Sequence, residues 1–137
     1  STASNCCCSS CQQFDAVLAH DRALADPSKA RESFLGHFGE SEIVQVPQGA
    51  VELEPQSARA VRCLKLTAGT PTLRWYCGEC RTPLWNAMRG LDFAGILVRP
   101  GIVECNTEAS WEEAVGPVEE TIFWEEAKGP ERLPGGR

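Results

Sequence analysis

Two groups of cysteines constrain what this chain can fold into more than any other feature. Eight of its 137 residues are cysteine. The first group reads Cys6-Cys7-Cys8-Ser9-Ser10-Cys11, and the second reads Cys77-Gly78-Glu79-Cys80. Three consecutive cysteines suit separate disulfides poorly, whereas a close thiolate group followed by a distant Cys-x-x-Cys is typical of a tetrahedral soft-metal site. The spacing therefore favours zinc binding over a disulfide scaffold.

The residues alone leave two interpretations of the ligand set. A trio from the first group would leave a fourth coordination position for water or substrate, as in catalytic zinc sites. Alternatively, Cys8 and Cys11 would join both cysteines of the second group in a closed structural site. The candidate metal ligands are Cys6, Cys8, Cys11, Cys77 and Cys80, and the first three are also the candidate catalytic residues.

The other three cysteines are predicted not to be ligands. Cys7 lies between two proposed ligands, and we expect it to point away from the metal. Cys63 lies in an alternating apolar and polar run, and Cys105 follows a valine and a glutamate. Both are interpreted as small core residues, because unpaired cysteine is among the most buried residue types.

Composition and charge exclude several classes of function. The chain is 42% hydrophobic and 23% charged, which is ordinary for a globular domain. A net charge of -6 argues against nucleic-acid binding, which needs clustered Lys and Arg to neutralise phosphates. No apolar run approaches the roughly 20 residues that span a bilayer, and the given N-terminus lacks the features of a secretory signal. We expect a cytoplasmic protein with no nucleic-acid or membrane partner, although a removed leader would leave no trace.

The pattern of apolar residues predicts one helix followed by a sheet. Phe14, Val17, Leu18 and Leu24 recur at helical spacing over residues 12–25, with Ser9 and Ser10 as possible N-caps. Short β-branched runs then alternate with turn residues, without the helical crossovers of a parallel sheet. The predicted strands, in an antiparallel arrangement, cover residues 43–46, 51–53, 61–66, 73–77, 84–88 and 96–98.

The chain is predicted to form a single domain over residues 1–128, because its length suits one modest core. Within this domain, residues 111–128 carry six glutamates around several aromatic residues, and we expect one aromatic face to pack on the sheet while the glutamates remain solvated. Residues 129–137 are rich in Gly and Pro and are predicted to form a flexible tail.

The two cysteine groups and their neighbours together carry a family resemblance. The matching segments are Cys6-x-Cys8-x-x-Cys11-Gln12-x-Phe14 and Leu73-Arg74-Trp75-Tyr76-Cys77-x-x-Cys80-x-Thr82-Pro83-Leu84-x-Asn86. Over about residues 6–105, the chain resembles the glutathione-dependent formaldehyde-activating enzyme family, which also includes centromere protein V-like domains. The resemblance implies a mainly β, β-tent fold of antiparallel sheets, with a zinc knuckle and a short helix after the N-terminal cysteine cluster.

The resemblance also implies zinc as a cofactor and glutathione as a possible co-substrate. Carried over residue by residue, Cys6, Cys8 and Cys11 match the trio assigned to the catalytic metal, whereas Cys77 and Cys80 match half of a structural zinc site. The earlier Cys-x-Cys of the family is missing here. Either an N-terminal part of the family domain is absent from this sequence, or the remaining cysteines form one merged site.

Three classes of function follow from these observations. The leading hypothesis is a zinc-dependent carbon–sulfur lyase that acts on an adduct of glutathione, or another small thiol, with an aldehyde or related electrophile. An acidic protein needs a local positive patch to hold anionic glutathione, and the candidates are Arg59, Arg62, Arg74 and Arg81. The alternatives are a non-catalytic zinc-stabilised binding module and a metal- or redox-handling protein.

Overall fold

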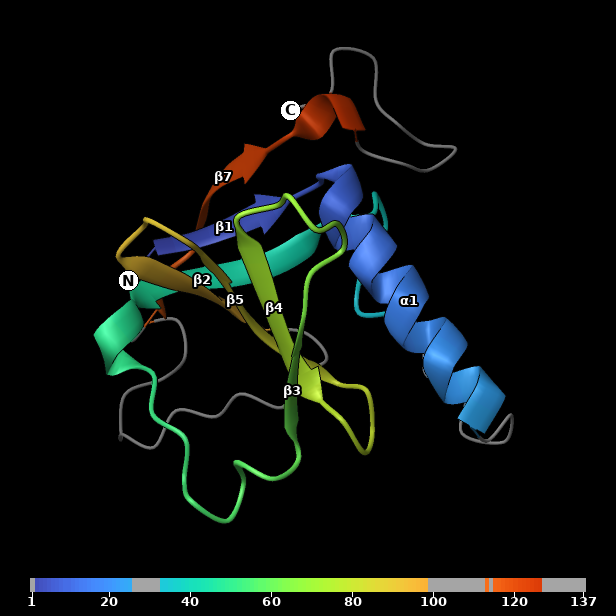
Figure 1. Cartoon of the computed structure of the whole chain (residues 1–137). Coiled ribbons are helices and arrows are strands. Elements are labelled where there is room, and N and C mark those ends of the chain that lie inside the picture. Colours follow the sequence, from blue (N-terminus) through green and yellow to red (C-terminus); the bar gives the residue numbers. More distant parts are fainter. Residues whose placement is uncertain (1, 26–32, 99–112, 114, 127–137) are drawn as a thin grey trace.

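One seven-stranded mixed sheet with a helix against it forms the described part of the chain (Figure 1). The computed structural model describes residues 2–25, 33–98, 113 and 115–126. The strand order is β3-β4-β5-β6-β2-β1-β7. The mainly β fold is therefore confirmed, and the helix begins within the first cysteine group, at Ser9.

The strands and helices have the following bounds. The strands are β1 (Thr2–Cys6), β2 (Ser41–Pro47), β3 (Val61–Leu64), β4 (Thr72–Cys77), β5 (Pro83–Met88), β6 (Phe93–Leu97) and β7 (Val118–Ile122). The α-helix α1 covers Ser9–Ala25, and two short 3-10 helices, η2 and η3, cover Gln48–Ala50 and Trp124–Glu126.

Strand pairing is antiparallel in five of the six pairs, and β1 with β7 is the parallel exception. The expectation of a purely antiparallel sheet was therefore wrong at this edge. The parallel pair joins the two extremes of the described chain, with Cys6 opposite Ile122. The hydrophobic pattern of the sequence does not predict this parallel pair, because β7 is exposed at four of its five residues.

The predicted strands were recovered except for one. Residues 43–46, 61–66, 73–77, 84–88 and 96–98 overlap β2 to β6, with boundary shifts of up to three residues. Residues 51–53 form no strand. β1 was missed because the sequence Thr-Ala-Ser-Asn-Cys lacks alternating β-branched residues, and β7 was missed because its glutamates suggested a solvated segment.

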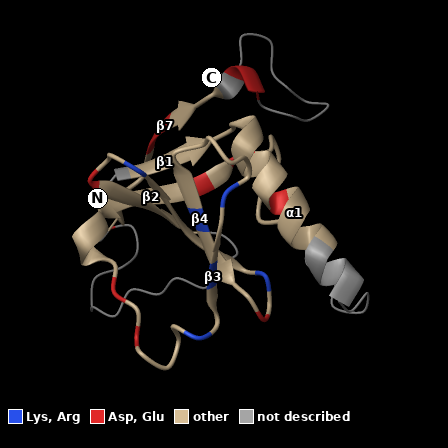
Figure 2. Ribbon diagram, viewed as in Figure 1, with Lys and Arg blue, Asp and Glu red and all other residues tan. Residues whose placement is uncertain are grey.

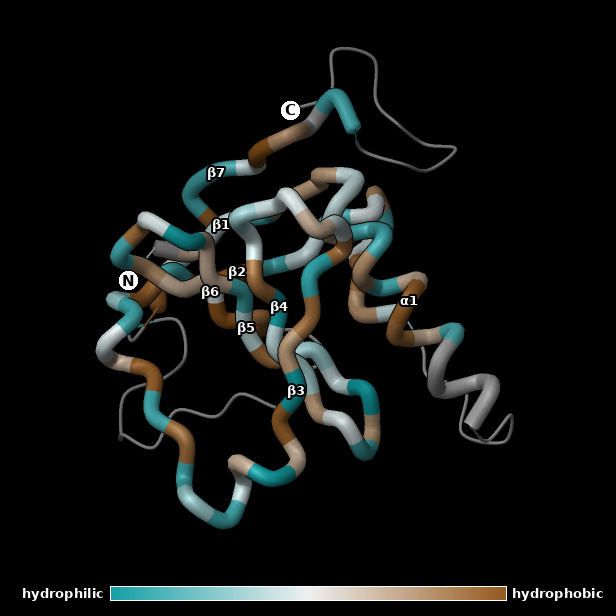
Figure 3. The backbone as a smooth tube through the Cα atoms, in the orientation of Figure 1, coloured by the Kyte–Doolittle hydropathy of each residue, from teal (hydrophilic) through white to brown (hydrophobic). Residues whose placement is uncertain are grey.

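α1 packs its buried face on the sheet and forms the main core. Phe14, Leu18, Phe34 and Leu97 form a buried cluster. The Phe14 ring meets Phe34 and Tyr76 edge-on, at centroid distances of 6.0 and 6.3 Å. Val17, expected on this face, is instead exposed. Apolar positions occur in α1 and in the central strands with hydrophilic positions between them (Figure 3).

One row of paired residues runs across the face of the sheet on which the cysteine cluster lies. Arg74 pairs with Asn86, Asn86 with Gly95, and Gly95 with Gln45, so the row crosses β4, β5, β6 and β2. Residues paired in this way project from the same face of a sheet. The row therefore combines three polar side chains with a position that has no side chain.

Residues 99–112 and 127–137 lie outside the described residues, and so does the tail predicted for 129–137.

Candidate metal centre and adjoining pocket

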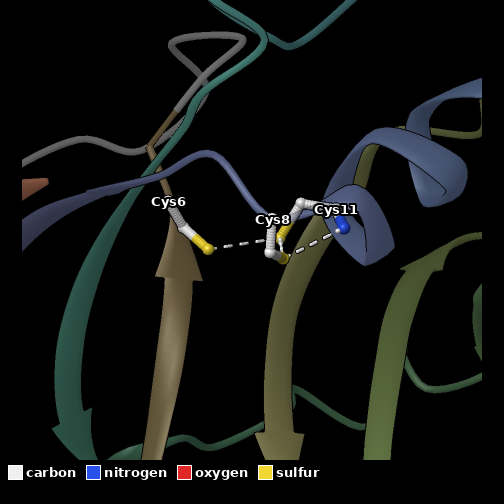
Figure 4. Close-up of side chains that lie close together, drawn as sticks. All are labelled: Cys6, Cys8 and Cys11. Carbon is white, nitrogen blue, oxygen red and sulfur yellow. Dashed lines mark hydrogen bonds between the residues drawn. The ribbon is translucent and has the colours of Figure 1, made fainter. Parts of the chain in front are cut away.

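The three predicted catalytic cysteines converge at the start of α1 (Figure 4). Cys6 is the last residue of β1, Cys8 lies in the connecting loop, and Cys11 is in the first turn of the helix. Their sulfur atoms all lie within 4.8 Å of one another. The Sγ distances are 3.2 Å from Cys8 to Cys11 and 3.8 Å from Cys11 to Cys6.

The start of α1 is built around sulfur rather than around the predicted serine caps. The helix begins at Ser9, so Ser9 and Ser10 lie inside its first turn. The Cys8 Sγ accepts the Cys11 N–H at 3.3 Å, which is the contact that an N-cap oxygen makes in other helices. The Glu126 carboxylate accepts the Ser9 N–H. Cys8 is therefore both a candidate ligand and the cap that orients Cys11.

A buried arginine lies directly beneath the cluster. Arg74 on β4 is only 4% exposed. Its Nη1 lies 3.8 Å from the Cys11 Sγ, its Nη2 donates to the Ser10 Oγ at 2.6 Å, and its guanidinium lies 5.3 Å from the centroid of the Phe14 ring. These contacts place a fixed positive charge beside the Cys11 sulfur, where it stabilises a thiolate.

The three cysteines share protons unequally. Hydrogen bonds with Cys6 and then Cys8 hold the pKa of the Cys11 thiol well below its ordinary value, and Arg74 adds to this effect. The same sulfur contacts raise the pKa of Cys6, with burial as a further cause. The hydrogen bond to Cys11 also raises the pKa of Cys8. The hydrogen bonds and the Arg74 charge therefore favour the thiolate form at Cys11 over the same form at its two neighbours.

The spacing of the sulfur atoms fits a tetrahedral metal ion. Zinc–sulfur bonds of about 2.3 Å at tetrahedral angles place two sulfurs about 3.8 Å apart. The distance from Cys11 to Cys6 matches this value, and the distance from Cys8 to Cys11 is shorter by 0.6 Å, that is 3.8 against 3.2 Å. Three thiols in this arrangement can hold a soft metal ion and leave one coordination position open.

The second cysteine group has the predicted turn but does not join the trio. Cys77 ends β4, and Cys80 precedes β5 in a tight turn in which the Arg81 N–H donates to the Cys77 carbonyl at 2.8 Å. A Cβ on Gly78 would come within 2.9 Å of the Arg62 side chain, so a larger residue there would displace Arg62. Among the described residues, the one cluster of three or more metal-ligating groups is the N-terminal trio. The merged four-cysteine site is therefore not formed.

The remaining cysteines follow the predictions in part. Cys7 is fully buried and lies outside the trio, as expected. Cys63 is exposed, so the prediction of a core residue was wrong; its side chain projects from an edge strand of the sheet. Cys105 lies outside the described residues. No disulfide joins any of the seven cysteines that the structure describes.

The trio lies at the side of a pocket of about 430 Å³. Cys6, Cys8 and Cys11 line it together with Arg74, which the sequence analysis proposed for a positive patch, and with Asn86 and Glu126, which were not assigned to a site from the sequence. The floor is the row of paired residues described above, and Gly95 leaves space within it. Asn86 does not stand out in the sequence beyond the resemblance, because its position in the pocket depends on strand register.

Two observations bear on the expected partners. Lys and Arg are scattered singly over the described strands and loops rather than gathered on one face (Figure 2). This distribution gives no support to a nucleic-acid partner. In the described residues, no helix combines the length and the apolar character that crossing a membrane requires.

Comparison with known proteins gives one match. Residues 2–135 match the family described as "Family of unknown function (DUF6151)". The chain has no significant match among curated proteins or among solved structures. The resemblance to the formaldehyde-activating enzymes therefore stays a prediction.

Proposed function

The chain belongs to the DUF6151 family, whose function is unknown, and we propose that it is a zinc-dependent carbon–sulfur lyase. Its substrate would be the adduct of a small thiol with an aldehyde or related electrophile. The observation that carries the proposal is the convergence of three thiols at a pocket large enough for a small molecule. A purely structural zinc site is closed by a fourth protein ligand, which the described residues do not bring to the trio.

Cys6, Cys8 and Cys11 would hold the metal. When bound, zinc would supply a Lewis acid that keeps a thiol sulfur deprotonated near neutral pH. The charge of Arg74 would keep Cys11 in the ligating thiolate form. The hydrogen bond from Arg74 to Ser10 would fix the position of the guanidinium. The apolar walls of the pocket would exclude water from the reacting bond.

The reaction needs one proton acceptor and no oxidant. Cleavage of a hemithioacetal breaks the carbon–sulfur bond, with the electron pair leaving on sulfur, while the hydroxyl loses its proton as the aldehyde carbonyl forms. Glu126 is the one carboxylate among the described residues that line the pocket, and we assign it this proton. The Glu126 carboxylate accepts a hydrogen bond from the Ser9 N–H, which holds it at the start of α1.

The test is the exchange rate between a thiol, an aldehyde and their adduct, measured by magnetisation-transfer NMR with the zinc-loaded protein. We expect the wild-type protein to accelerate exchange and Cys8→Ser to abolish the acceleration. Serine is a good N-cap, so this variant preserves the start of α1 while removing a ligand. Glu126→Gln should slow exchange by about 10²-fold, as is typical of a lost general base.

Two results would overturn the proposal. The first is wild-type protein that binds zinc but leaves exchange at the uncatalysed rate, which would favour the binding-module alternative. The second is Cys8→Ser protein that accelerates exchange as well as the wild type does, because the trio would then have no part in the chemistry.

A further inference from the structure

The mouth of the pocket is unusually apolar. Met88, Leu91, Phe93 and Phe123 all line it, yet each is between 39% and 48% exposed. They make up four of the seven large hydrophobic side chains that are exposed in the described residues. Exposed apolar residues that gather around one cavity mark a binding surface, because their burial by a ligand is favourable.

The charges around the pocket do not suit glutathione. Arg74 is the one Lys or Arg among the described residues that line the pocket, and its contacts with Ser10, Cys11 and Phe14 already engage it. The other lining charge is the negative Glu126.

The remaining arginines proposed from the sequence lie elsewhere. Arg59, Arg62 and Arg81 do not line this pocket. Arg62 donates to the Val61 carbonyl at 3.0 Å, and Arg81 lies over the Tyr76 ring at 5.7 Å. A ligand with two carboxylates would therefore be desolvated without a cation to pair with it, which is unfavourable.

One residue on the floor of the pocket, Asn86, has an oxygen that lacks a hydrogen-bond donor within the described part of the chain. The Asn86 Oδ1 is buried and has no hydrogen-bond partner among the described residues. A buried acceptor without a partner is unfavourable, because it has lost its hydrogen bonds to water. An N–H or O–H group on a bound molecule would remove this cost. Asn86 is next to Gly95 in the sheet, and both residues line the pocket.

We propose that the pocket binds a neutral, largely apolar small molecule that carries one hydrogen-bond donor, in place of glutathione. This inference rests on the proposed function. It means that the thiol substrate, or its adduct, carries an aliphatic or aromatic group. The apolar part lies against the mouth, and the donor reaches Asn86.

The experiment compares ligands that need no metal and differ in charge. Binding of 4-phenylbutan-1-ol, 4-phenylbutyrate and glutathione to the full chain is measured by ligand-observed NMR, with and without zinc. We expect the alcohol to bind at least about tenfold more tightly than the carboxylate, because the pocket offers a carboxylate no unengaged cation. Glutathione should not displace the alcohol from the metal-free protein.

Two variants test the location. Gly95→Val should abolish binding of the alcohol, because a side chain there fills the floor, while the nearest contact of its Cβ, 3.5 Å from the Ile43 Cδ1, is an ordinary one. Leu91→Asn should weaken binding about fivefold through lost apolar contact. Leu53→Asn is the matched control, because Leu53 is equally exposed in a loop but does not line the pocket.

The outcomes separate this inference from the proposed function. Equal or tighter binding of 4-phenylbutyrate or glutathione would overturn the inference, and so would identical effects of Leu91→Asn and Leu53→Asn. Tight binding of the alcohol, lost in Gly95→Val, supports it even if adduct exchange is not catalysed, in which case the lyase proposal alone fails.

Discussion

The two cysteine groups differ in the elements that supply their cysteines and in the residues that surround them. The N-terminal trio comes from a strand end, a loop and a helix turn, and it faces a pocket and a buried arginine. The Cys77–Cys80 pair lies on one turn between adjacent strands, half-buried and outside the trio. Short spacing along the chain is common to both. Only the trio combines several elements with a neighbouring charge, and this is what separates a candidate reactive centre from a turn that contains cysteines.

The strongest test of the difference between the two groups is to remove one sulfur from each and compare the zinc affinity. Cys8→Ser should lower the affinity for zinc by about a thousandfold, because one of three thiolate ligands is lost. Cys80→Ser should leave the affinity of the trio unchanged. Chelator competition measures both, and circular dichroism checks that each variant keeps its fold. Equal losses in the two variants would mean that both groups share one metal.

The pH dependence of zinc binding sharpens the comparison further. Cys6 and Cys8 have raised pKa values because of their hydrogen bonds to the Cys11 sulfur, so both must lose a proton when the metal binds. The pKa of Cys11 is lowered, so we expect Cys11 to release no proton when the metal binds. Affinity should therefore rise with pH by about two protons per zinc, up to a hundredfold per pH unit, and fall as pH is lowered.

Chelator competition between pH 6.5 and 8 measures this slope. A slope of three protons would show that Cys11 is protonated before binding, and a slope near zero would show that the cluster is already fully ionised.

The buried arginine distinguishes the trio from the second group, and its removal should have a moderate effect. Arg74→Met should lower zinc affinity about tenfold, as is usual for groups that orient or charge-stabilise a metal ligand. Arg74→Lys should recover part of the loss, because it keeps the charge without the bond geometry toward Ser10. Isothermal titration calorimetry measures both. An Arg74→Met protein with unchanged affinity and unchanged melting temperature would show that the guanidinium has no part in tuning Cys11.

The smallest effect is expected in the second group. Gly78→Ala should destabilise the protein by about 1 kcal/mol, because the new methyl group presses on Arg62 and the Ala60 carbonyl. Zinc affinity of the trio should not change. Thermal denaturation and chelator competition follow the two quantities. A change in affinity without a change in stability would link this turn to the metal centre.

Local features of this molecule could be predicted from the sequence, and distant ones could not. The trio lies within six residues, and the β4–β5 turn joins neighbouring strands, so spacing alone identified both. The capping role of Cys8 was not predicted, because serines follow it and are the usual caps. Asn86 and Gly95 acquire their importance from strand register, which depends on pairing across four strands. The contact between Glu126 and Ser9 spans 117 positions, and nothing in the glutamate-rich segment marks this one residue.

The parallel pairing of β1 with β7 has a consequence for synthesis of the protein. Cys6 leaves the ribosome more than 110 residues before its neighbour Ile122, and Ser9 leaves it more than 110 residues before the Glu126 carboxylate. Contacts so far apart in the chain form late in folding. During translation the three thiols would thus be present without their final strand and without the acidic cap, exposed to oxidation or to stray metal ions. If zinc bound a nascent chain early, it would occupy the three cysteines before β7 and Glu126 had formed their contacts with β1 and α1.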